Sequence, residues 1–518
     1  MEIESTNPTR HPKTHPRAVT RRRALQIAGL GTLGAVAACT NTTGMTNGPQ
    51  HVTRGNFKLP DTKLPDRSIK FRLTDSGDQK AVFWKSFAKA YEKKHDNVQI
   101  SYKALDWPDL DQSITLGLRN GSVPDVFFLP TTVTNGQAVS EKWIGAWDDI
   151  IPNWAEVKKR FPDGTFVVGK TDFNGKTYAF PLTSAQRFNS LVFYNKQITD
   201  RADADLSQPL GWDEYRQLLK KITKQGDGKY YGTIMGLQQD GAGFSSVMAQ
   251  MGGIGGGIGG IDWRTGEYNY TKPLSLEAVE YLLAIYADGS IAPGSVSYKE
   301  ADAKGRFPQG QAGFLIQGPW NISPWRDQNA DFTFDFTIPP QRDPKDIYPV
   351  GYAPGGSNQY VYNPHTKAPK MVADIISYMC TKAGQAQWAS IDGAADPAAF
   401  PEAIEEADLS SLDAKAMKIN SKYEVLAPEP SVRNPDVEKV YEVQKPLEPD
   451  FGDVCLGLLT GQVKGGVKKA LNDLQDRANK ALDEAIATAK KRGADVSRDD
   501  WVFKDWDPKK PYDSTSTK

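Results

Sequence analysis

The spacing of apolar residues switches between two periods along the first part of the chain. Residues 68–73 and 98–102 alternate apolar with polar side chains, and residues 126–129 form a short apolar run, so all three segments are predicted strands. Apolar residues recur every three or four positions over 79–94 and again around 114–118, as in amphipathic helices. The order strand, helix, strand, helix, strand predicts a parallel sheet with helices on its faces.

The rest of the chain contains further patterns of both kinds. Residues 467–490 carry a long apolar stripe and residues 370–389 carry a second one, so both are predicted helices, and residues 231–235 are a predicted strand. The last segment, residues 497–518, is polar and contains proline, which indicates a wrap or tail. A chain of 518 residues is longer than one ordinary domain and has room for two lobes with separate cores.

The N-terminal segment has the layout of an export signal. Three arginines at 21–23 precede a mildly apolar stretch, residues 24–38, which is too short to cross a bilayer as a stable helix. The arginines resemble a twin-arginine signal, and the small residues before Cys39 resemble a lipobox, although a cysteine after small residues also occurs without this meaning. We expect residues 1–38 to be a signal peptide and residues 39–67 a flexible tether. Lipid on Cys39 would hold the protein on the outer face of the cytoplasmic membrane.

Charge, aromatic content and cysteine content narrow the classes of ligand. Lys and Arg together number 63, as do Asp and Glu, so the protein has no net positive charge that would attract nucleic acid. The 12 Trp, 20 Tyr and 21 Phe residues mostly serve packing, but sugar rings also bind to flat aromatic faces. The three cysteines show no metal-ligand spacing, and we expect neither a metal nor a cofactor. Cys380 and Cys455 form either one disulfide or two buried thiols.

Catalytic motifs are scarce in the chain. Beyond the signal and tether only His95 and His365 remain, both in polar surroundings, and no GxSxG or HExxH motif is present. Residues 255–260 match GxGxxG, but the residues after them predict a strand and a turn instead of the helix that dinucleotide binding requires. A surface-anchored glycoside hydrolase needs only two carboxylates, so this class of enzyme stays as the alternative to a binding protein.

Four motifs follow one another along the chain in a recognisable order. They are GSVPDV (121–126), LVFYNK (191–196), PLGWDE (209–214) and GQAGFLIQGPW (310–320). Together they resemble the extracellular solute-binding proteins of ABC importers, in the branch that includes maltose-type binding proteins. Gly211 departs from the usual pattern, which has Thr at that position. The resemblance extends from about residue 68 to about residue 490.

This resemblance implies an α/β, two-lobed, periplasmic-binding-protein-like (Venus flytrap) fold with hinge crossovers. Lobe 1 would comprise residues 68–183 and 349–392, and lobe 2 residues 184–348 and 393–518. Such a protein closes on a sugar or oligosaccharide between its lobes and delivers it to the permease subunits of an ABC transporter in the membrane. We expect a monomer with a carbohydrate ligand. A non-sugar solute, such as an amino acid, a peptide or a polyamine, is the further alternative.

Ligands of parallel α/β sheets bind where the loops after the strands converge, which points to the first candidate ligand-binding residues. After the first strand these are Asp75, Ser76 and Asp78, which are alternatively caps of the helix that follows. After the strand at 126–129 the candidate is Thr132, a hydroxyl at a position where the resemblance often implies an acid.

Further candidates follow from the positions that the resemblance implies for the hinge and the cleft. Arg187 and Asn189 lie in the first crossover at the cleft floor, where Arg187 either contacts the ligand or forms a structural ion pair. Gln239 follows the strand at 231–235, and Gly356 lies in a glycine-rich return strand where backbone can approach a ligand closely. Trp320 is the foremost candidate, because it follows a Gly-Pro pair at a strand end, and its indole either lines the cleft mouth or belongs to the core. The weaker tryptophan candidates, which we expect to be structural, are Trp107, Trp263 and Trp325.

Overall fold

The computed structural model describes residues 55–512 except 78, 188–189, 239–259, 330 and 357. All of these residues belong to the unit Pro49–Lys518. The predicted signal peptide, Cys39 and most of the tether lie outside the described residues, and so do Asp78, Asn189 and Gln239. Within the described ranges, none of the helices has the length and apolar character that a membrane span requires.

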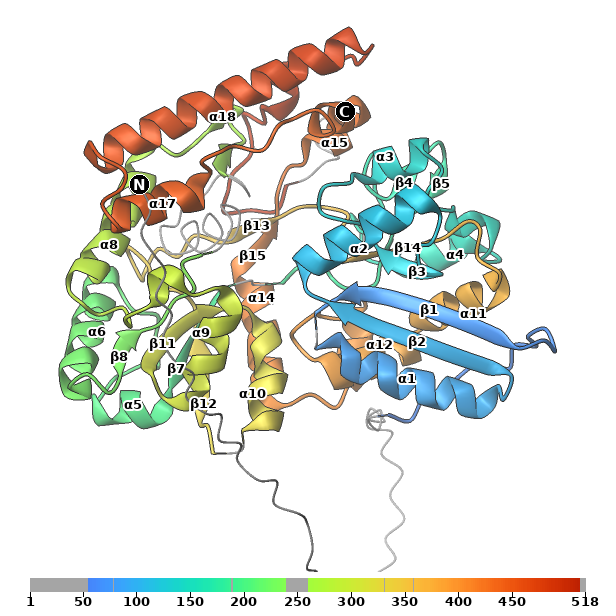
Figure 1. Cartoon of the computed structure of the whole chain (residues 1–518), viewed down its shortest axis with the longest axis horizontal. Coiled ribbons are helices and arrows are strands. Elements are labelled where there is room, and N and C mark those ends of the chain that lie inside the picture. The colour runs from blue at the N-terminus through green and yellow to red at the C-terminus, as the bar shows by residue number, and fades with distance from the viewer. Residues whose placement is uncertain are drawn as a thin grey trace, which may run out of the picture. The chain divides into compact units, whose positions relative to one another are not determined.

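The first lobe is built on a five-stranded sheet (Figure 1). Its strands, in spatial order, are β2 (Val98–Leu105), β1 (Ile69–Ser76), β3 (Val126–Phe128), β14 (Gln359–Tyr362) and β6 (Phe180–Pro181). β1 pairs in parallel with β2 and β3, whereas β14 runs antiparallel to β3 and β6. The alternation predicted for the first strand is confirmed, since Ile69, Phe71 and Leu73 are buried and the residues between them are exposed.

Helices lie on both sides of this sheet (Figure 1). α1 (Lys80–Lys94) follows β1, and α2 (Trp107–Asn120) follows β2 and ends at Gly121, whose φ of 69° is a left-handed conformation typical of helix ends. The prediction of one helix over 370–389 is wrong, because the chain forms α11 (Pro369–Met379) and α12 (Lys382–Asp392). The Thr381 hydroxyl accepts a hydrogen bond from the Gly384 N–H and so caps the second helix. The smaller elements of this lobe are α3 (Asn135–Ser140), α4 (Trp154–Lys158), β4 (Asp172–Phe173), β5 (Lys176–Thr177) and α13 (Pro401–Glu406).

The second lobe is built on a four-stranded sheet. Its strands, in spatial order, are β12 (Phe334–Thr337), β7 (Leu191–Asn195), β11 (Ala312–Gln317) and β8 (Tyr231–Thr233). β7 is antiparallel to both neighbours, and β11 is parallel to β8. Its helices include α5 (Lys196–Arg201), α6 (Trp212–Gly226), α8 (Pro273–Ala287), α9 (Glu300–Arg306), α10 (Ile322–Gln328) and α14 (Ser411–Tyr423). Gly211 cannot cap α6 with a side chain, but the Glu214 carboxylate accepts a hydrogen bond from the Gly211 N–H at 3.0 Å.

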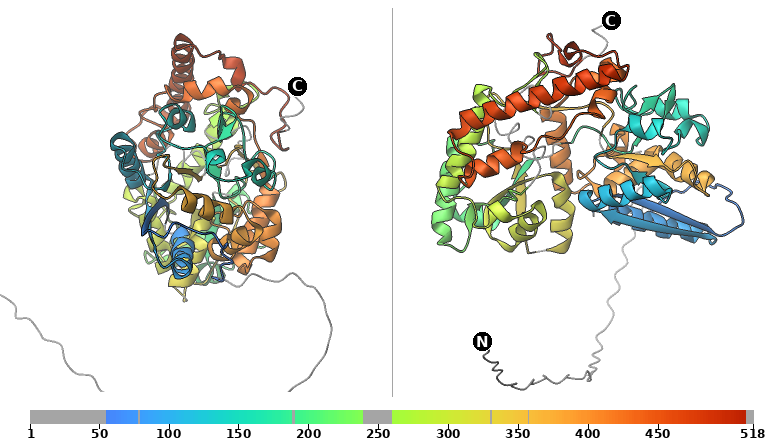
Figure 2. Two further views of the ribbon diagram at one scale, coloured as in Figure 1. Left: turned by 90° about the vertical axis from the view of Figure 1, so that its right-hand side faces the viewer. Right: turned by 45° about the horizontal axis from the view of Figure 1, so that its top comes forward.

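The C-terminal part of the chain packs on the second lobe. α17 (Phe451–Leu459) and α18 (Gly466–Lys491) lie side by side (Figure 2), and the long helix predicted at 467–490 is thereby confirmed. α18, the hairpin of β9 (Ile261–Asp262) and β10 (Glu267–Tyr268), and the end of the chain share one apolar cluster. Trp501 in this end segment is fully buried, so the polar end of the chain wraps onto the core. Two short helices precede α17, namely α15 (Pro430–Arg433) and α16 (Glu438–Tyr441).

The chain passes between the two sheets several times. Residues 182–190 join β6 to β7, and residues 338–358 join β12 to β14 and contain β13 (Val350–Tyr352). β13 pairs in parallel with β15 (Glu424–Leu426), which follows α14. Residues 393–400 leave α12 and run beside the first passage, where the Ser184 N–H donates to the Pro397 carbonyl at 2.8 Å. These passages are the hinge crossovers of the predicted two-lobed α/β fold.

The apolar cores show how segments are divided between the lobes. Ala398, Phe400 and Ala403 pack in the core of the first lobe, and Ala416 on α14 packs in a core of the second. Cys380 and Cys455 lie in different cores and are two buried free thiols, so they do not form a disulfide.

Candidate functional site

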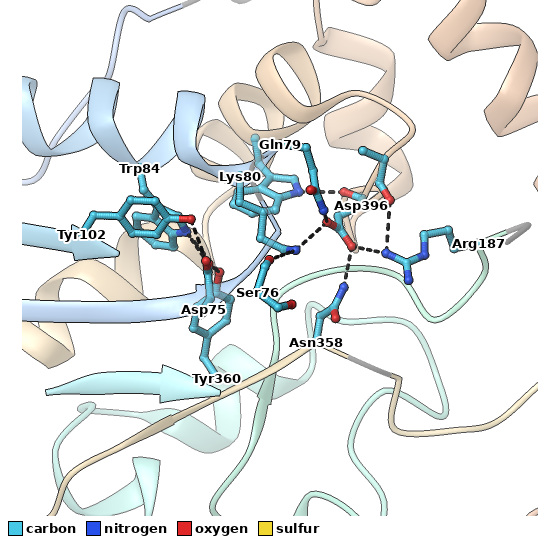
Figure 3. A network of polar contacts seen from close by, with 12 residues as sticks. Asp75, Ser76, Gln79, Lys80, Trp84, Tyr102, Arg187, Asn358, Tyr360 and Asp396 are labelled. Atoms are coloured by element: carbon cyan, nitrogen blue, oxygen red, sulfur yellow. Dashed lines mark hydrogen bonds and ion pairs between the residues drawn. The ribbon is translucent and has the colours of Figure 1, made fainter. Parts of the chain in front are cut away.

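A buried carboxylate, Asp396, lies at the centre of a polar network at the junction of the lobes (Figure 3). Its Oδ2 accepts from Lys80 Nζ at 2.9 Å and from Gln79 Nε2 at 3.2 Å, both at the start of α1. Its Oδ1 forms an ion pair with Arg187 of the first passage and accepts from Asn358 of the second. One carboxylate therefore ties together four groups from three distant segments of the chain.

Two basic side chains offset the cost of burying this carboxylate. Burial acts to raise the pKa of Asp396, but the positive charges of Lys80 and Arg187 outweigh burial and lower it. The neighbouring Asp392 is also buried, and neither of its oxygens has a partner among the described residues. Burial and then the charge of Asp396 raise the pKa of Asp392 well above its ordinary value.

Asp75 and Ser76, at the end of β1, lie beside this network (Figure 3). The Asp75 carboxylate is fully buried and accepts from the hydroxyls of Tyr102 at 2.6 Å and Tyr360 at 2.5 Å, and from Trp84 Nε1 at 3.1 Å. Burial raises the pKa of Asp75 to about 6. Ser76 accepts from Lys80 Nζ through its backbone carbonyl at 2.8 Å. The described cap of α1 uses no side-chain hydrogen bond, so neither residue caps this helix.

Arg187 connects the network to the second lobe. Its Nη1 also donates to the Ala395 carbonyl at 3.2 Å, and its guanidinium lies 5.4 Å from the ring centre of Trp320, within cation–π range. Trp320 is half-buried in a short 3₁₀ helix, Pro319–Asn321, directly after β11. A Cβ on Gly318 would lie 2.1 Å from the indole, so only glycine lets the ring take this place.

The remaining candidates are placed differently. Gly356 has a φ of 67° and lies beside the first passage, since a Cβ there would meet Pro181 and Ala185 at 3.6 and 3.7 Å. Thr132 is exposed in the loop after β3, and within the described part of the chain no hydrogen bond or ion pair joins it to the Asp396 network. The structure thus brings together Asp75, Ser76, Arg187, Trp320 and Gly356, and leaves Thr132 apart.

Sequence reasoning missed the centre of the site, Asp396 and Lys80. Two signals were available for them. Lys80 lies on the stripe that Trp84, Phe87 and Tyr91 continue along α1, which is an apolar face where a solvated lysine does not belong. Asp396 is the one acid in a run of small and apolar residues, 393–400. Lys80 and Asp396 are each a single charged residue in an apolar segment, and two such residues of opposite charge indicate a buried ion pair.

The candidate site offers positioning groups and an aromatic face. Among the described residues, no group of His, Cys, Asp and Glu side chains is arranged to hold a metal ion. Two α/β lobes joined by hinge passages are the architecture of the periplasmic-binding-protein class.

Comparison with known proteins identifies the family. The profile of the family described as bacterial extracellular solute-binding protein matches residues 86–417, and the chain belongs to this family. Members of the family bind solutes and are not enzymes, so the glycoside hydrolase alternative is dropped. The maltotriose-binding protein of Pyrococcus abyssi (strain GE5 / Orsay) is 22% identical over 304 residues, which are 54% of this chain and 58% of that protein. The match thus spans less than two thirds of this curated relative.

Solved structures share the fold over most of the chain. An ABC substrate-binding protein of Listeria monocytogenes in complex with cycloalternan has a TM-score of 0.57 at 18% identity, covering 81% of this chain and 100% of that one. A solute-binding protein of Thermotoga lettingae bound with α-D-tagatose has a TM-score of 0.59 at 16% identity, covering 80% and 100%. The GacH receptor of Streptomyces glaucescens, studied unliganded and with acarbose, has a TM-score of 0.58 at 16% identity, covering 81% and 100%. The predicted two-lobed α/β fold is confirmed.

Proposed function

We propose that the protein captures a sugar or oligosaccharide between its lobes, on the face formed by Trp320 and Arg187. The observation that carries this proposal is the Trp320–Arg187 pair, with the guanidinium 5.4 Å from the ring centre and anchored by a buried carboxylate. A flat indole suits the apolar face of a sugar ring, and a fixed guanidinium suits its hydroxyl oxygens. The names of the similar proteins, which include ligands such as maltotriose and cycloalternan, support the same class of ligand.

The other candidate residues take supporting roles in this proposal. Asp78, Thr132 and the backbone at Gly356 would contact the sugar from the first lobe, and Asn189 and Gln239 from the second. Asp75 and Ser76 would support the site without touching the sugar, because their buried groups already have partners within the protein. They would keep β1 and α1 in place under the ligand.

Capture would proceed by closure of the lobes. Ligand contacts on both sides stabilise the closed form by their differential affinity for it, and the hinge passages allow the movement. We take lobe 1 as 68–183 and 349–392, and lobe 2 as 184–348 and 393–518. Residues between Ala398 and Ala407 pack in the core of the first lobe. This packing favours moving the boundary at residue 392, where lobe 1 ends, beyond residue 407. The closed form would then meet the permease subunits of an ABC transporter and release its sugar there.

The proposal extends to the cellular setting of the protein. Residues 1–38 would direct export through a twin-arginine-like signal, and lipid on Cys39 would anchor the mature chain to the outer face of the cytoplasmic membrane. The tether up to residue 67 would let the binding lobes reorient beside the permease. The protein would act as a monomer. Replacing Cys39 by Ser should release the protein from membranes into the medium, and retention in the membrane fraction would contradict the lipid anchor.

A thermal-shift screen tests the ligand class. The protein is heated with mono-, di- and oligosaccharides, and each mixture is then analysed for cleavage products. A sugar present at about a hundred times its dissociation constant should add about 2.7 kcal/mol of stability, which is a clear rise in melting temperature. A shift with intact sugar is the expected result. No shift with any sugar, but a shift with amino acids, peptides or polyamines, would replace carbohydrate by that class.

A further inference from the structure

Trp107 is a tryptophan with a large part of its surface in water. It is the first residue of α2, shortly after the end of β2, and it is 41% exposed. Trp263 and Trp325, for which the sequence also predicts a structural role, are each 7% exposed. A tryptophan that only fills the core is covered in this way by its neighbours. Trp107 therefore has aromatic surface that the packing of the protein does not use.

One side of the Trp107 ring is supported by Phe128, the last residue of β3. The two rings are stacked, with their centres 6.2 Å apart and their planes at 27°. Phe128 is itself only 1% exposed, and the Tyr360 ring packs edge-on against it at 4.6 Å. The open surface of Trp107 therefore lies on the side away from Phe128, on a ring that is held from behind.

The first turn of α2 is tied to the loop after β3. Asp111 lies one helical turn after Trp107, on the same face of α2. Its Oδ1 accepts a hydrogen bond from the Thr131 N–H at 2.8 Å, and its Oδ2 accepts one from the Thr131 hydroxyl. Thr132, the next residue, is an exposed candidate for ligand binding. Trp107 and Thr132 thus belong to the same strand-end edge of the first sheet.

A series of direct contacts joins Trp107 to Arg187 of the candidate binding face. Behind Trp107, the Lys80 ammonium lies 5.7 Å from the ring centre of Phe128. Lys80 Nζ lies 2.9 Å from Asp396 Oδ2, and Asp396 pairs with Arg187 (Figure 3). The carboxyl ends of the parallel strands β1, β2 and β3 share one edge of the sheet, which is where ligands of parallel α/β sheets bind. The exposed indole therefore lies at the ligand-binding edge of the first lobe.

We propose that Trp107 is a ligand-binding residue of the first lobe, and that its exposed indole face stacks on the apolar face of a sugar ring. This inference rests on the proposed function and adds to it a first-lobe counterpart of Trp320. Because the two tryptophans belong to different lobes, a sugar that stacks on both is held most tightly when the lobes are closed. The structural role expected from the sequence would instead leave sugar affinity independent of the Trp107 ring.

Indole resonances test the contact directly. The full chain is labelled with ¹⁵N at the tryptophan indoles, and Trp107→Phe and Trp320→Phe variants assign the two resonances. Glucose, maltose, maltotriose and raffinose are each added up to millimolar concentration. At least one of these sugars should move both resonances, as each ring gains a sugar on its face. Movement of the Trp320 resonance alone would overturn the role of Trp107 and leave the proposed function standing, whereas movement of neither would overturn both.

Substitutions on one helix separate binding from packing. Trp107→Ala should weaken binding of the sugar that moves both resonances by about tenfold, because the aromatic face is lost. Trp107→Phe keeps an aromatic face and should bind within about threefold of the parent. Leu116→Ala removes a 61% exposed apolar side chain further along α2 and should leave the affinity unchanged. A Trp107→Ala variant that folds like the parent by circular dichroism and binds the sugar equally well would overturn the proposal.

Discussion

Asp392 and Asp396 are two buried carboxyls of the same short segment with opposite electrostatic surroundings, and replacing each by Asn should have opposite effects. Asp396 has Lys80 at 2.9 Å and an ion pair with Arg187. Asp392 has no partner for either oxygen among the described residues. The two substitutions are equal in size and shape, so they change charge and hydrogen bonding while leaving packing nearly the same.

The Asp396→Asn variant should be strongly destabilised at pH 7. The side chain of Lys80 is only 2% exposed, so the substitution leaves a buried ammonium without its counter-charge. Removing one member of such a buried pair typically costs about 3–5 kcal/mol. The pKa of Asp396 is lowered in the folded protein, so its contribution is present above the unfolded pKa of about 3.9 and is lost as the pH falls through the lower folded value.

The Asp392→Asn variant should be more stable than the parent at pH 7. The folded pKa of Asp392 is raised well above its ordinary value, so the folded state holds a proton that the unfolded state releases above about pH 4. Between these two pKa values the parent loses about 1.4 kcal/mol of stability for each pH unit. Asparagine removes this loss, so the advantage of the variant should grow as the pH rises above about 4 towards the folded pKa of Asp392.

Urea unfolding of the parent and both variants at pH 4, 5, 6 and 7 measures these effects, with circular dichroism as the probe and equal m-values as the condition for comparison. The reasoning would be refuted by a loss below about 1 kcal/mol for Asp396→Asn at pH 7, which is far under the cost of an orphaned buried charge. It would also be refuted if both substitutions changed the free energy of unfolding in the same direction and by the same amount.

Three further predictions concern the binding face and the cysteines. Trp320→Ala should weaken sugar binding by about 1–3 kcal/mol, measured by calorimetry, because the aromatic face is lost; unchanged affinity in a folded variant would remove this residue from the site. Gly318→Ala should also weaken binding, because its Cβ would lie 2.1 Å from the indole and displace it, whereas Gly305→Ala, with open space around the Cβ, should not. Cys380 and Cys455 should react with a thiol reagent only in denaturant, because both are buried and burial raises the pKa of each thiol; rapid reaction of the native protein, with its third cysteine replaced, would contradict their burial.

Local patterns predicted the elements well where periodicity alone decides them. The helix expected at 79–94 is α1, Lys80–Lys94, and the long C-terminal helix matches α18 to within a residue at each end. The helix expected at 370–389 failed because its apolar stripe continues from one helix into the next. The capping hydroxyl of Thr381, which starts a new helix in the middle of that stripe, is a stronger local signal than the period.

The site was predictable only in part. Trp320 and Arg187 were predicted separately, each from its own motif, but nothing local showed that they contact one another. The network behind them escaped prediction because its members are remote in the chain, with Gln79 and Asp396 separated by 317 positions. Pattern reasoning detects periods of two or three to four residues, whereas a long-range ion pair leaves only an isolated charge in an apolar segment.

The Asp396 network also has a consequence for the order in which the chain folds. The first lobe begins near residue 69, yet Lys80 in its first helix acquires a counter-charge only when Asp396 has been synthesised. A chain that ends before Asp396 would have to bury an unpaired ammonium or keep α1 off the sheet, so the lobe that starts first cannot be completed early. Contacts of such long sequence separation also slow folding, because a large loop must close before they form. The first lobe should therefore stay incompletely folded during synthesis until about three quarters of the chain has emerged. A chaperone would have to bind the incomplete lobe until then.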